Sequence, residues 1–310
     1  MTTENLRAGS DSGAPGEGAW TVESGVLSTA DGVKLALRWA RVAGETRADV
    51  VLVHGLGEHA GRYGHVAAVL AERGLRMCAW DLRGHGRSEG GRGDAERYEL
   101  LVDDLARVVE RFTGEGRPWF LLAHSFGGQV ALRFLEERQP GCAGAVVFAP
   151  WVRLAFDPPW WKLALARAAL RVWPAFAQQT GNSWARLSRD TAHLASLPDL
   201  DLVHHRISAR LYFAMRAAGE TVLAEAGRLR VPLLLLHGEE DPVTCREATR
   251  ELCERAGSAD KTLRLCPGAR HEIHNDLGRE RVVAEVADWL VARLPATAGN
   301  FPFPSRTPPV

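Results

Sequence analysis

The chain has 310 residues, of which 46% are hydrophobic and 25% are charged, proportions typical of a globular protein with a large core. Its 38 basic and 38 acidic side chains give a net charge of zero, which argues against a nucleic-acid partner. No apolar run approaches the roughly 20 residues that a membrane span needs. The five cysteines are scattered without zinc-like spacing, so we expect buried thiols rather than a metal site or a disulfide framework.

The two ends of the chain differ in composition from the rest. Residues 1–19 are rich in glycine, serine and alanine and have no periodic apolar pattern, which predicts a flexible tail. They also lack the charged and apolar segments of a signal peptide, so we expect a cytoplasmic protein. Residues 296–310 contain four prolines and predict an extended tail.

Between the tails, short apolar runs alternate with segments of helical periodicity. Strands are predicted at 33–40, 49–54, 75–80, 118–123, 143–149, 231–237 and 262–266. Helices are predicted at 62–73, 97–113, 127–138, 245–256 and 278–294. Nearly continuous valine and leucine runs separated by helices are typical of a mostly parallel, doubly wound sheet with helices on both faces. The predicted fold class is therefore α/β, in which ligands bind at the carboxyl ends of the strands.

Residues 151–228 interrupt this alternation. They contain no clear strand pattern and hold five of the ten tryptophans. Because the segment leaves the sheet after the carboxyl end of a strand, we interpret it as a helical cap above the site. The core of the fold then comprises residues 20–150 and 229–295.

The sequence AHSFGG at 123–128 lies between a predicted strand and a predicted helix. A serine at the apex of a strained strand-to-helix turn, with small residues two positions before and after it, is typical of a nucleophile elbow. Ala123 and Gly127 hold those positions around Ser125, although alanine adds one methyl group to the usual glycine. We therefore predict that Ser125 is a nucleophile.

A serine nucleophile needs a base, and in this type of fold an acid and then a histidine follow the serine along the chain. Asp241 lies in the loop GEEDPVT after the strand predicted at 231–237. His271 lies in the loop PGARHEIHND after the strand predicted at 262–266. The three residues therefore follow three different strands, which predicts a Ser125–His271–Asp241 triad that needs no metal or organic cofactor.

An acyl-transfer site also needs two N–H groups that stabilise the developing oxyanion, each contributing roughly 3–4 kcal/mol. One is expected from Phe126, directly after the serine. The other is expected from the loop HGLGEHAGRY at 54–63, where Gly55 and Gly57 let the backbone bend toward a substrate. Leu56, between these glycines, is the predicted second donor.

Five segments occur in a recognisable order: HGLGEHAGRY, WDLRGHGRSEG (80–90), AHSFGG, GEEDPVT and GARHEIHND. Together they resemble the monoacylglycerol lipase and lysophospholipase branch of the α/β-hydrolases over about residues 20–295. The resemblance implies the α/β-hydrolase fold with a helical cap, and a serine hydrolase that cleaves monoacylglycerols. It also implies that Glu58, Arg62 and His274 contact the glycerol end of the substrate. We interpret the 80–90 segment as structural.

Other functions remain open at this point. A lysophospholipase, a broad carboxylesterase or an acyltransferase would use the same chemistry on a related ester. A non-catalytic binding protein on a hydrolase scaffold is an alternative of a different class. A dehalogenase or an epoxide hydrolase on this fold would have an aspartate in place of Ser125.

The first half of the predicted cap is basic. Asp157 is its only acid between Trp151 and Arg189, and its basic residues are Arg153, Lys162, Arg167, Arg171, Arg186 and Arg189. One interpretation is an ordinary lid packed on the core. The other is a lid whose apolar side chains line an acyl tunnel and whose outer face contacts anionic lipid. The predicted partner is therefore a lipid ester, and the second interpretation adds peripheral contact of the cap with an anionic membrane.

Overall fold

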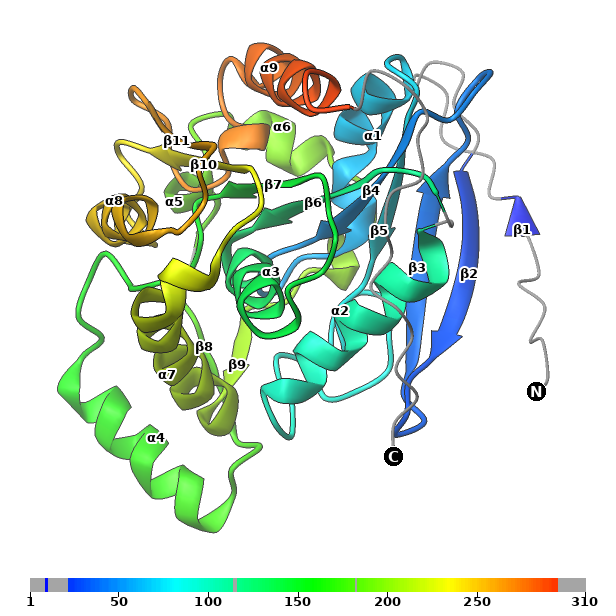
Figure 1. Cartoon of the computed structure of the whole chain (residues 1–310). Coiled ribbons are helices and arrows are strands. Elements are labelled where there is room, and N and C mark those ends of the chain that lie inside the picture. The colour runs from blue at the N-terminus through cyan, green and yellow to red at the C-terminus, as the bar shows by residue number, and fades with distance from the viewer. Residues whose placement is uncertain (1–8, 11–21, 114–115, 182, 295–310) are drawn as a thin grey trace.

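The computed structural model describes residues 9–10, 22–113, 116–181 and 183–294. Within these residues the central feature is a mixed sheet of nine strands with helices on both faces (Figure 1). The predicted tails lie outside the described residues, apart from the two-residue strand β1 at Gly9–Ser10.

The order of strands across the sheet is β1-β2-β3-β5-β4-β6-β7-β10-β11. The strands from β5 to β11 in this order are parallel, whereas β1, β2 and β3 pair antiparallel at one edge. Their bounds are β2 Val22–Ser28, β3 Lys34–Ala40, β4 Ala48–Val53, β5 Leu75–Trp80, β6 Trp119–His124, β7 Gly144–Phe148, β10 Leu233–Gly238 and β11 Lys261–Cys266. All seven predicted strands are confirmed. Strand β2 was not predicted, because its sequence VESGVLS has no continuous apolar run.

The five helices predicted for the core are also confirmed. They are α1 Gly64–Ala71, α2 Glu99–Phe112, α3 Ser125–Arg138, α8 Arg246–Arg255 and α9 Arg279–Val291. Helices α1 and α9 cover one face of the sheet, and α2, α3 and α8 cover the other (Figure 1). The start of the helix predicted at 62–73 is instead a 3-10 turn, η1, at Ala60–Tyr63.

Each face of the sheet has its own hydrophobic core. The alternation of side chains along β4 shows this directly: Val51 and Val53 pack toward α2 and α3, whereas Val50 and Leu52 pack toward α1 and α9. A strand buried on both faces needs apolar side chains on both, which explains the continuous apolar run from Val50 to Val53. The two cores hold the carboxyl ends of the parallel strands at one edge.

Among its described residues, the segment between β7 and β10 forms four α-helices, two short 3-10 helices and a small separate sheet. The helices are α4 Trp160–Val172, α5 Trp184–Leu187, α6 Thr191–Ser196 and α7 Ala209–Glu225. The expectation of a strand-free cap is wrong, since β8 (Ala177–Gln179) pairs antiparallel with β9 (Arg206–Ser208). Strands of three residues are too short to produce a recognisable alternation, and backbone pairing defines them.

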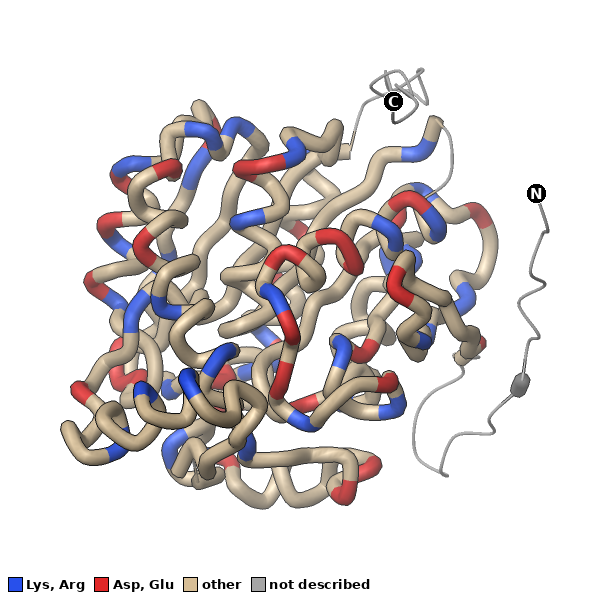
Figure 2. Tube along the Cα trace, turned by 90° about the horizontal axis from the view of Figure 1, so that it is seen from below, with Lys and Arg blue, Asp and Glu red and all other residues tan. Residues whose placement is uncertain are grey.

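The distribution of charges and the state of the cysteines can be compared with what the composition suggested. Basic and acidic residues are interspersed along the chain in Figure 2, so neither sign occupies one side alone in that view. Cys78, Cys142 and Cys266 are buried, whereas Cys245 and Cys253 are half-buried, and all five are free thiols. Within the described residues, no helix combines the length and the apolar character needed to span a bilayer.

Candidate active site

Ser125 lies at a sharp turn between β6 and α3. Its φ of 52° is in the left-handed region, which is costly for a residue with a side chain and agrees with the strained turn expected from the sequence. The turn brings the start of α3 against the end of β4. A Cβ atom on Gly127 would lie 2.2 Å from the carbonyl oxygen of His54, so this position requires glycine.

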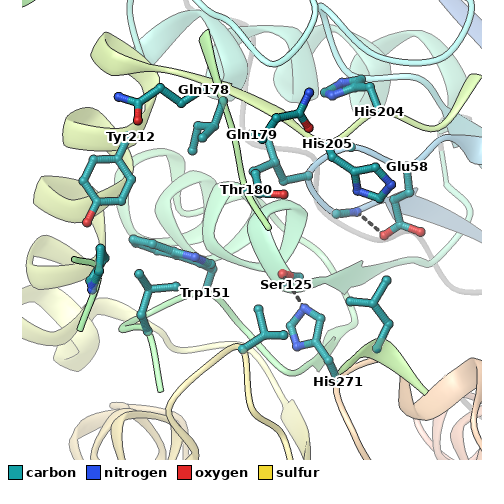
Figure 3. Close-up of a pocket in the computed structure, with 18 of the residues that line it drawn as sticks. Glu58, Ser125, Trp151, Gln178, Gln179, Thr180, His204, His205, Tyr212 and His271 are labelled. Carbon is teal, nitrogen blue, oxygen red and sulfur yellow. Dashed lines mark hydrogen bonds between the residues drawn. The ribbon is translucent and has the colours of Figure 1, made fainter. Parts of the chain in front are cut away.

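The structure brings Ser125, His271 and Asp241 into one hydrogen-bonded chain. The Oγ atom of Ser125 lies 2.9 Å from Nε2 of His271 (Figure 3). Nδ1 of His271 lies 2.8 Å from Oδ2 of Asp241. Ser125 and His271 are 5% and 3% exposed, so the serine–histidine contact is shielded from bulk water. In this geometry Nε2 can accept the serine proton while Nδ1–H donates to the carboxylate.

Several groups hold the Asp241 carboxylate in place. Oδ1 accepts from the backbone N–H groups of Val243 and Thr244 at 2.7 and 3.1 Å. Oδ2 accepts from the Thr244 hydroxyl at 2.7 Å and lies 3.2 Å from Nε2 of His237. Burial alone would raise the pKa of Asp241, but the charge of His271 and hydrogen bonds from His237 and His271 hold that pKa well below its usual value.

The contribution of His237 and Thr244 was not predicted from the sequence. Thr244 lies in the same GEEDPVT segment as Asp241, and His237 is the last residue of the strand predicted at 231–237. A polar residue at the end of a buried strand, four positions before the acid, was the available signal.

The loop after β4 lies directly beside the nucleophile. A Cβ atom on Gly55 would lie 3.3 Å from the Cβ of Ser125. The two predicted oxyanion donors are therefore close together in the chain trace, since Leu56 follows Gly55 and Phe126 follows Ser125. Neither N–H group has a hydrogen-bond acceptor among the described residues, which leaves both available to a substrate oxygen.

The three residues predicted to contact glycerol do not share one environment. Glu58 and Arg62 line the cavity in front of Ser125. His274 does not line it, because it is completely buried behind His124, where its ring stacks on Tyr63 at a centroid distance of 4.9 Å. Burial holds the pKa of His274 well below its ordinary value, so this ring is neutral.

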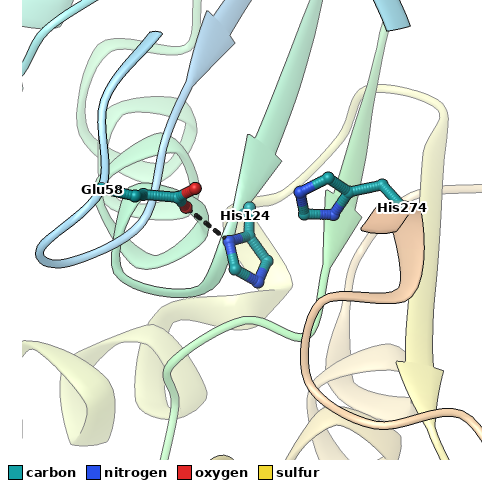
Figure 4. Close-up of side chains that lie close together, drawn as sticks. All are labelled: Glu58, His124 and His274. Atoms are coloured by element: carbon teal, nitrogen blue, oxygen red, sulfur yellow. Dashed lines mark hydrogen bonds and ion pairs between the residues drawn. The ribbon is translucent and has the colours of Figure 1, made fainter. Parts of the chain in front are cut away.

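Glu58, His124 and His274 also form a cluster of possible metal ligands, with donor atoms within 4.8 Å of one another (Figure 4). However, Oε1 of Glu58 already accepts hydrogen bonds from the Gly55 N–H, the Tyr63 hydroxyl and Nδ1 of His124. Oε2 of the same carboxylate pairs with the Arg62 guanidinium. A metal ion would have to displace these donors next to an arginine, so the cluster fits a hydrogen-bond network better than a cation site.

The chain matches the family described as serine aminopeptidase, S33, over residues 44–278. It belongs to this family of α/β-hydrolases. The match spans the described elements from the loop before β4 to the loop that carries His271.

Relatives within this hydrolase family include monoacylglycerol lipases. The monoacylglycerol lipase of Mycolicibacterium smegmatis is 32% identical over 254 residues, covering 81% of this chain and 90% of the relative. The crystal structure of the Paleococcus ferrophilus monoacylglycerol lipase superposes with a TM-score of 0.75 at 33% identity, covering 84% of this chain and 99% of that one. An abhydrolase domain-containing protein of Dictyostelium discoideum is 32% identical over 89% of this chain, which spans 30% of that longer protein.

The cavity of this α/β-hydrolase lies between the catalytic edge of the core and the cap. It has a volume of about 180 Å³. Apolar side chains from both parts line it, including those of Trp151, Leu154, Leu163, Ile207 and Val243. Polar side chains from the cap face it across from Ser125, as Figure 3 shows, and these are Gln178, Gln179, Thr180, His204, His205 and Tyr212. The cavity thus offers both an apolar and a polar surface to a ligand.

Proposed function

We propose that the protein is a serine ester hydrolase that cleaves the acyl ester of a monoacylglycerol. The observation that carries the proposal is the hydrogen-bonded chain of Ser125, His271 and Asp241 at the strained turn. A serine at such a turn, with a histidine positioned to take its proton, can attack an ester carbonyl. A serine with a purely structural role would not need this partner. A binding protein on this scaffold would not need the triad.

The reaction proceeds through two acyl transfers. Ser125 Oγ attacks the ester carbonyl carbon while its proton moves to Nε2 of His271, and Asp241 stabilises the imidazolium. The N–H groups of Leu56 and Phe126 donate to the oxyanion of the tetrahedral intermediate. The carbon–oxygen bond to glycerol then breaks, and His271 gives its proton to the departing alcohol. Water attacks the acyl-serine by the same route in reverse and releases the fatty acid and free Ser125.

The choice of substrate is supported by the relatives and by the cavity. The relatives from Mycolicibacterium smegmatis and Paleococcus ferrophilus are monoacylglycerol lipases. The apolar part of the cavity suits an acyl chain, and its polar part suits a hydroxylated alcohol. A lysophospholipid or a simple ester would fit the same triad, so the alcohol portion has to be tested directly.

The test is a panel of esters with one acyl chain and different alcohols: glycerol, glycerophosphocholine and ethanol. We expect the highest kcat/KM for the glycerol ester, with Ser125→Ala as the inactive control. A higher kcat/KM for the lysophospholipid would identify the protein as a lysophospholipase, and equal values would indicate a broad esterase. Transfer of the acyl group to added alcohol in preference to water would indicate an acyltransferase. Binding of the esters without turnover would favour a binding protein.

We also propose that residues 151–228 act as a cap that docks on an anionic membrane surface through α4. Trp161, Leu165 and Val172 recur at helical spacing on one face of α4 and are 52%, 45% and 87% exposed. The other face of this helix contributes Leu163 and Ala166 to the cavity wall. A helix with a lipid-compatible outer face and a cavity on its inner face suits an enzyme that takes substrate from a membrane.

The charges on α4 support the same orientation. Lys162, Arg167 and Arg171 have no carboxylate partner within the part of the chain that the structure describes. By contrast, Arg153 pairs with Glu220 of the cap and Glu251 of the core, and Arg189 pairs with Asp276 of the core. Three positive charges without a carboxylate partner therefore lie on the helix with the exposed apolar face. This arrangement would suit a cytoplasmic protein that contacts a membrane peripherally, and this location stays a prediction.

A further inference from the structure

We infer that four buried charged side chains fix the relative positions of the three loops that carry the oxyanion donors, Ser125 and His271. In this role they are positioning residues of the reaction. The four are Glu58, Arg62, His124 and Glu272, and we call them the loop clamp. The inference rests on the proposed function, because it concerns how the proposed triad and oxyanion donors are held. It gives Glu58 and Arg62 a role that does not depend on contact with glycerol.

Glu58 ties the oxyanion loop to the nucleophile turn. Its Oε1 accepts from the backbone N–H of Gly55 at 2.5 Å, and Gly55 directly precedes the proposed donor Leu56. The same oxygen lies 2.7 Å from Nδ1 of His124, and His124 directly precedes Ser125. One carboxylate oxygen therefore contacts both loops that are proposed to supply the N–H groups of the oxyanion hole.

Arg62 connects the oxyanion loop to the loop that carries the base. Its NH1 group donates to Oε2 of Glu58 at 3.0 Å, and its NH2 group donates to Oε2 of Glu272 at 2.8 Å. NH1 also lies 3.2 Å from Oε1 of Glu272, so the contact with that carboxylate is bidentate. Because Glu272 follows His271, the guanidinium fixes the spacing between the base and the oxyanion loop.

His124 completes the network as a second cation. Its Nδ1 faces the Glu58 carboxylate, and its Nε2 lies 3.3 Å from the carbonyl oxygen of His271. Both ring nitrogens thus face acceptors, which favours the doubly protonated ring. Burial would lower the pKa of His124, but the charge and hydrogen bond of Glu58 raise it above its ordinary value. The clamp then contains two carboxylates and two cations.

The four clamp residues border the cavity in front of Ser125, but their side chains are almost fully buried, and nearly all of their polar atoms already have partners. Glu58, Arg62, His124 and Glu272 are 3%, 5%, 2% and 2% exposed. Within the described residues, Nε of Arg62 is the one clamp side-chain atom that is buried without a partner. Removing one member would leave a buried charge uncompensated, which costs far more than losing a surface ion pair. We expect the surrounding loops to shift until that charge finds water or another partner.

The experiment compares two buried arginines. Arg83 matches Arg62, since each side chain is 6% exposed and each pairs with two carboxylates. The partners of Arg83 are Asp31 and Asp104, which join the β2–β3 turn to α2 and touch none of the three catalytic loops. Arg62→Met and Arg83→Met should therefore lower Tm by similar amounts, whereas only Arg62→Met should displace the catalytic groups.

The kinetic readout uses a glycerol ester and an aryl ester with the same acyl chain. For Arg62→Met we expect kcat to fall about 10²-fold on both esters, because a misplacement of about 1 Å has this effect, while KM changes little. Arg83→Met should retain kcat within about twofold of wild type. A rise in KM confined to the glycerol ester would mean that Arg62 binds the alcohol, and would overturn the clamp. Equal kcat values for the two variants would overturn it as well.

A milder variant covers the case in which Arg62→Met does not fold. Glu272→Gln keeps the shape of the side chain but removes its charge, and it should lower kcat about tenfold on both esters. A lower Tm with unchanged kcat would overturn the clamp. If the proposed function is wrong, the result differs: wild type would cleave the aryl ester but not the glycerol ester. The variants can then still be compared on the aryl ester.

Discussion

Helices α3 and α4 have 14 and 13 residues, but the protein packs them in opposite ways. In α3 every residue from Ser125 to Glu136 is buried, whereas in α4 only Ala166 and Ala169 are. The start of α3 is held by the sheet, by α2 and by the loop clamp, and α4 lies at the edge of the molecule (Figure 1). The difference indicates which part must keep its geometry for chemistry and which part is available to contact a surface.

A buried catalytic edge and an exposed cap helix should respond differently to substitution. A change of one atom at the edge alters groups that have no room to rearrange, so its effect should appear in kcat. A change on the outer face of α4 meets solvent, so its effect should appear in surface binding. The following substitutions test this contrast, beginning with the largest expected effect.

Ser125→Ala removes one oxygen atom from the most constrained turn of the protein. We expect a loss of about 10⁶-fold in kcat on any ester, since removing the nucleophile of a triad has this effect. Tm should stay the same or rise, because alanine loses no packing and the hydroxyl contacts only His271 among the described residues. Ester turnover and thermal unfolding measure the two quantities. A variant that kept one tenth of the wild-type turnover would show that Ser125 is not the nucleophile.

Gly57→Ala should have a smaller but still large effect. Gly57 has a φ of 83°, and a Cβ atom there would lie 2.1 Å from the carbonyl oxygen of His204, which belongs to the cap. The matched control is Gly181→Ala, because Gly181 has a φ of 75° and no atom within 4 Å of its added Cβ. Both variants carry the same backbone strain of about 1–2 kcal/mol, but only Gly57→Ala also separates the cap from the oxyanion loop.

We therefore expect kcat for a short soluble ester to fall about 10²-fold in Gly57→Ala, the effect of a shift of about 1 Å near the reacting atoms. Gly181→Ala should stay near wild type in kcat. If both variants lost the same activity, backbone strain alone would explain the result. The cap would then have no fixed contact with the oxyanion loop that matters for turnover.

The raised pKa of His124 predicts a loss of stability at alkaline pH. A cation whose pKa is higher in the folded than in the unfolded protein stabilises the fold fully below the unfolded value, near 6.5 for histidine, and this contribution is lost as the pH rises through the folded pKa. The groups facing this ring are Glu58, Arg62, Glu272, His271, His274 and His54. Of these, the Glu58 carboxylate has the largest stabilising effect on the cation.

The measurement is the urea midpoint of wild type and of Glu58→Gln between pH 6 and pH 10. Without the carboxylate, burial lowers the folded pKa of His124, so the alkaline loss should be smaller in the variant and should end at a lower pH. Burial also raises the pKa of Glu136, to about 8, so this carboxyl group adds a loss in the same direction. Both proteins contain Glu136, and the difference between their curves cancels it. If the urea midpoints of the two proteins changed with pH in the same way, His124 would not carry a second ring proton in the folded protein.

The smallest effect on chemistry is expected on α4. Changing Lys162, Arg167 and Arg171 together to glutamate should weaken association with anionic vesicles, and added salt should weaken that of wild type. In the double variant Arg167→Glu, Arg171→Glu, turnover of a short soluble ester should remain within about twofold of wild type, since neither charge has a carboxylate partner in the described chain and neither lines the cavity, whereas Lys162 does. Co-sedimentation at low and high salt provides the readout. Equal sedimentation of both proteins would make α4 an ordinary lid, and a parallel fall in turnover would mean that its charges hold the cap closed.

The core elements could be predicted because each depends on a local pattern. Buried parallel strands such as β4 have continuous apolar sequences, and the nucleophile turn needs small residues at fixed spacing around Ser125. Asp241 and His271 could be found from their positions after strands, since parallel strands bring their carboxyl ends to one edge. Strand β2 and the pair β8 and β9 were missed, because antiparallel edges and three-residue strands have no distinctive apolar run.

The environment of the site depends on tertiary contacts that no local pattern records. Arg62 and Glu272 are 210 positions apart in the chain, yet their side chains form a bidentate pair. The resemblance placed Glu58, Arg62 and His274 together at the alcohol end of the substrate. In the structure His274 lies behind His124 instead, because stacking on Tyr63 buries it completely. Its contact with glycerol stays a prediction without support from the cavity lining.

The central claim is that Ser125 carries the acyl group during ester hydrolysis. The most direct measurement is peptide mapping of the protein after reaction with a fluorophosphonate, alongside the remaining turnover of a glycerol monoester. We predict one phosphonyl group per chain, located on Ser125, and a loss of turnover in proportion to its occupancy. Full modification of Ser125 with turnover retained, or loss of turnover with the label on another residue, would contradict the account.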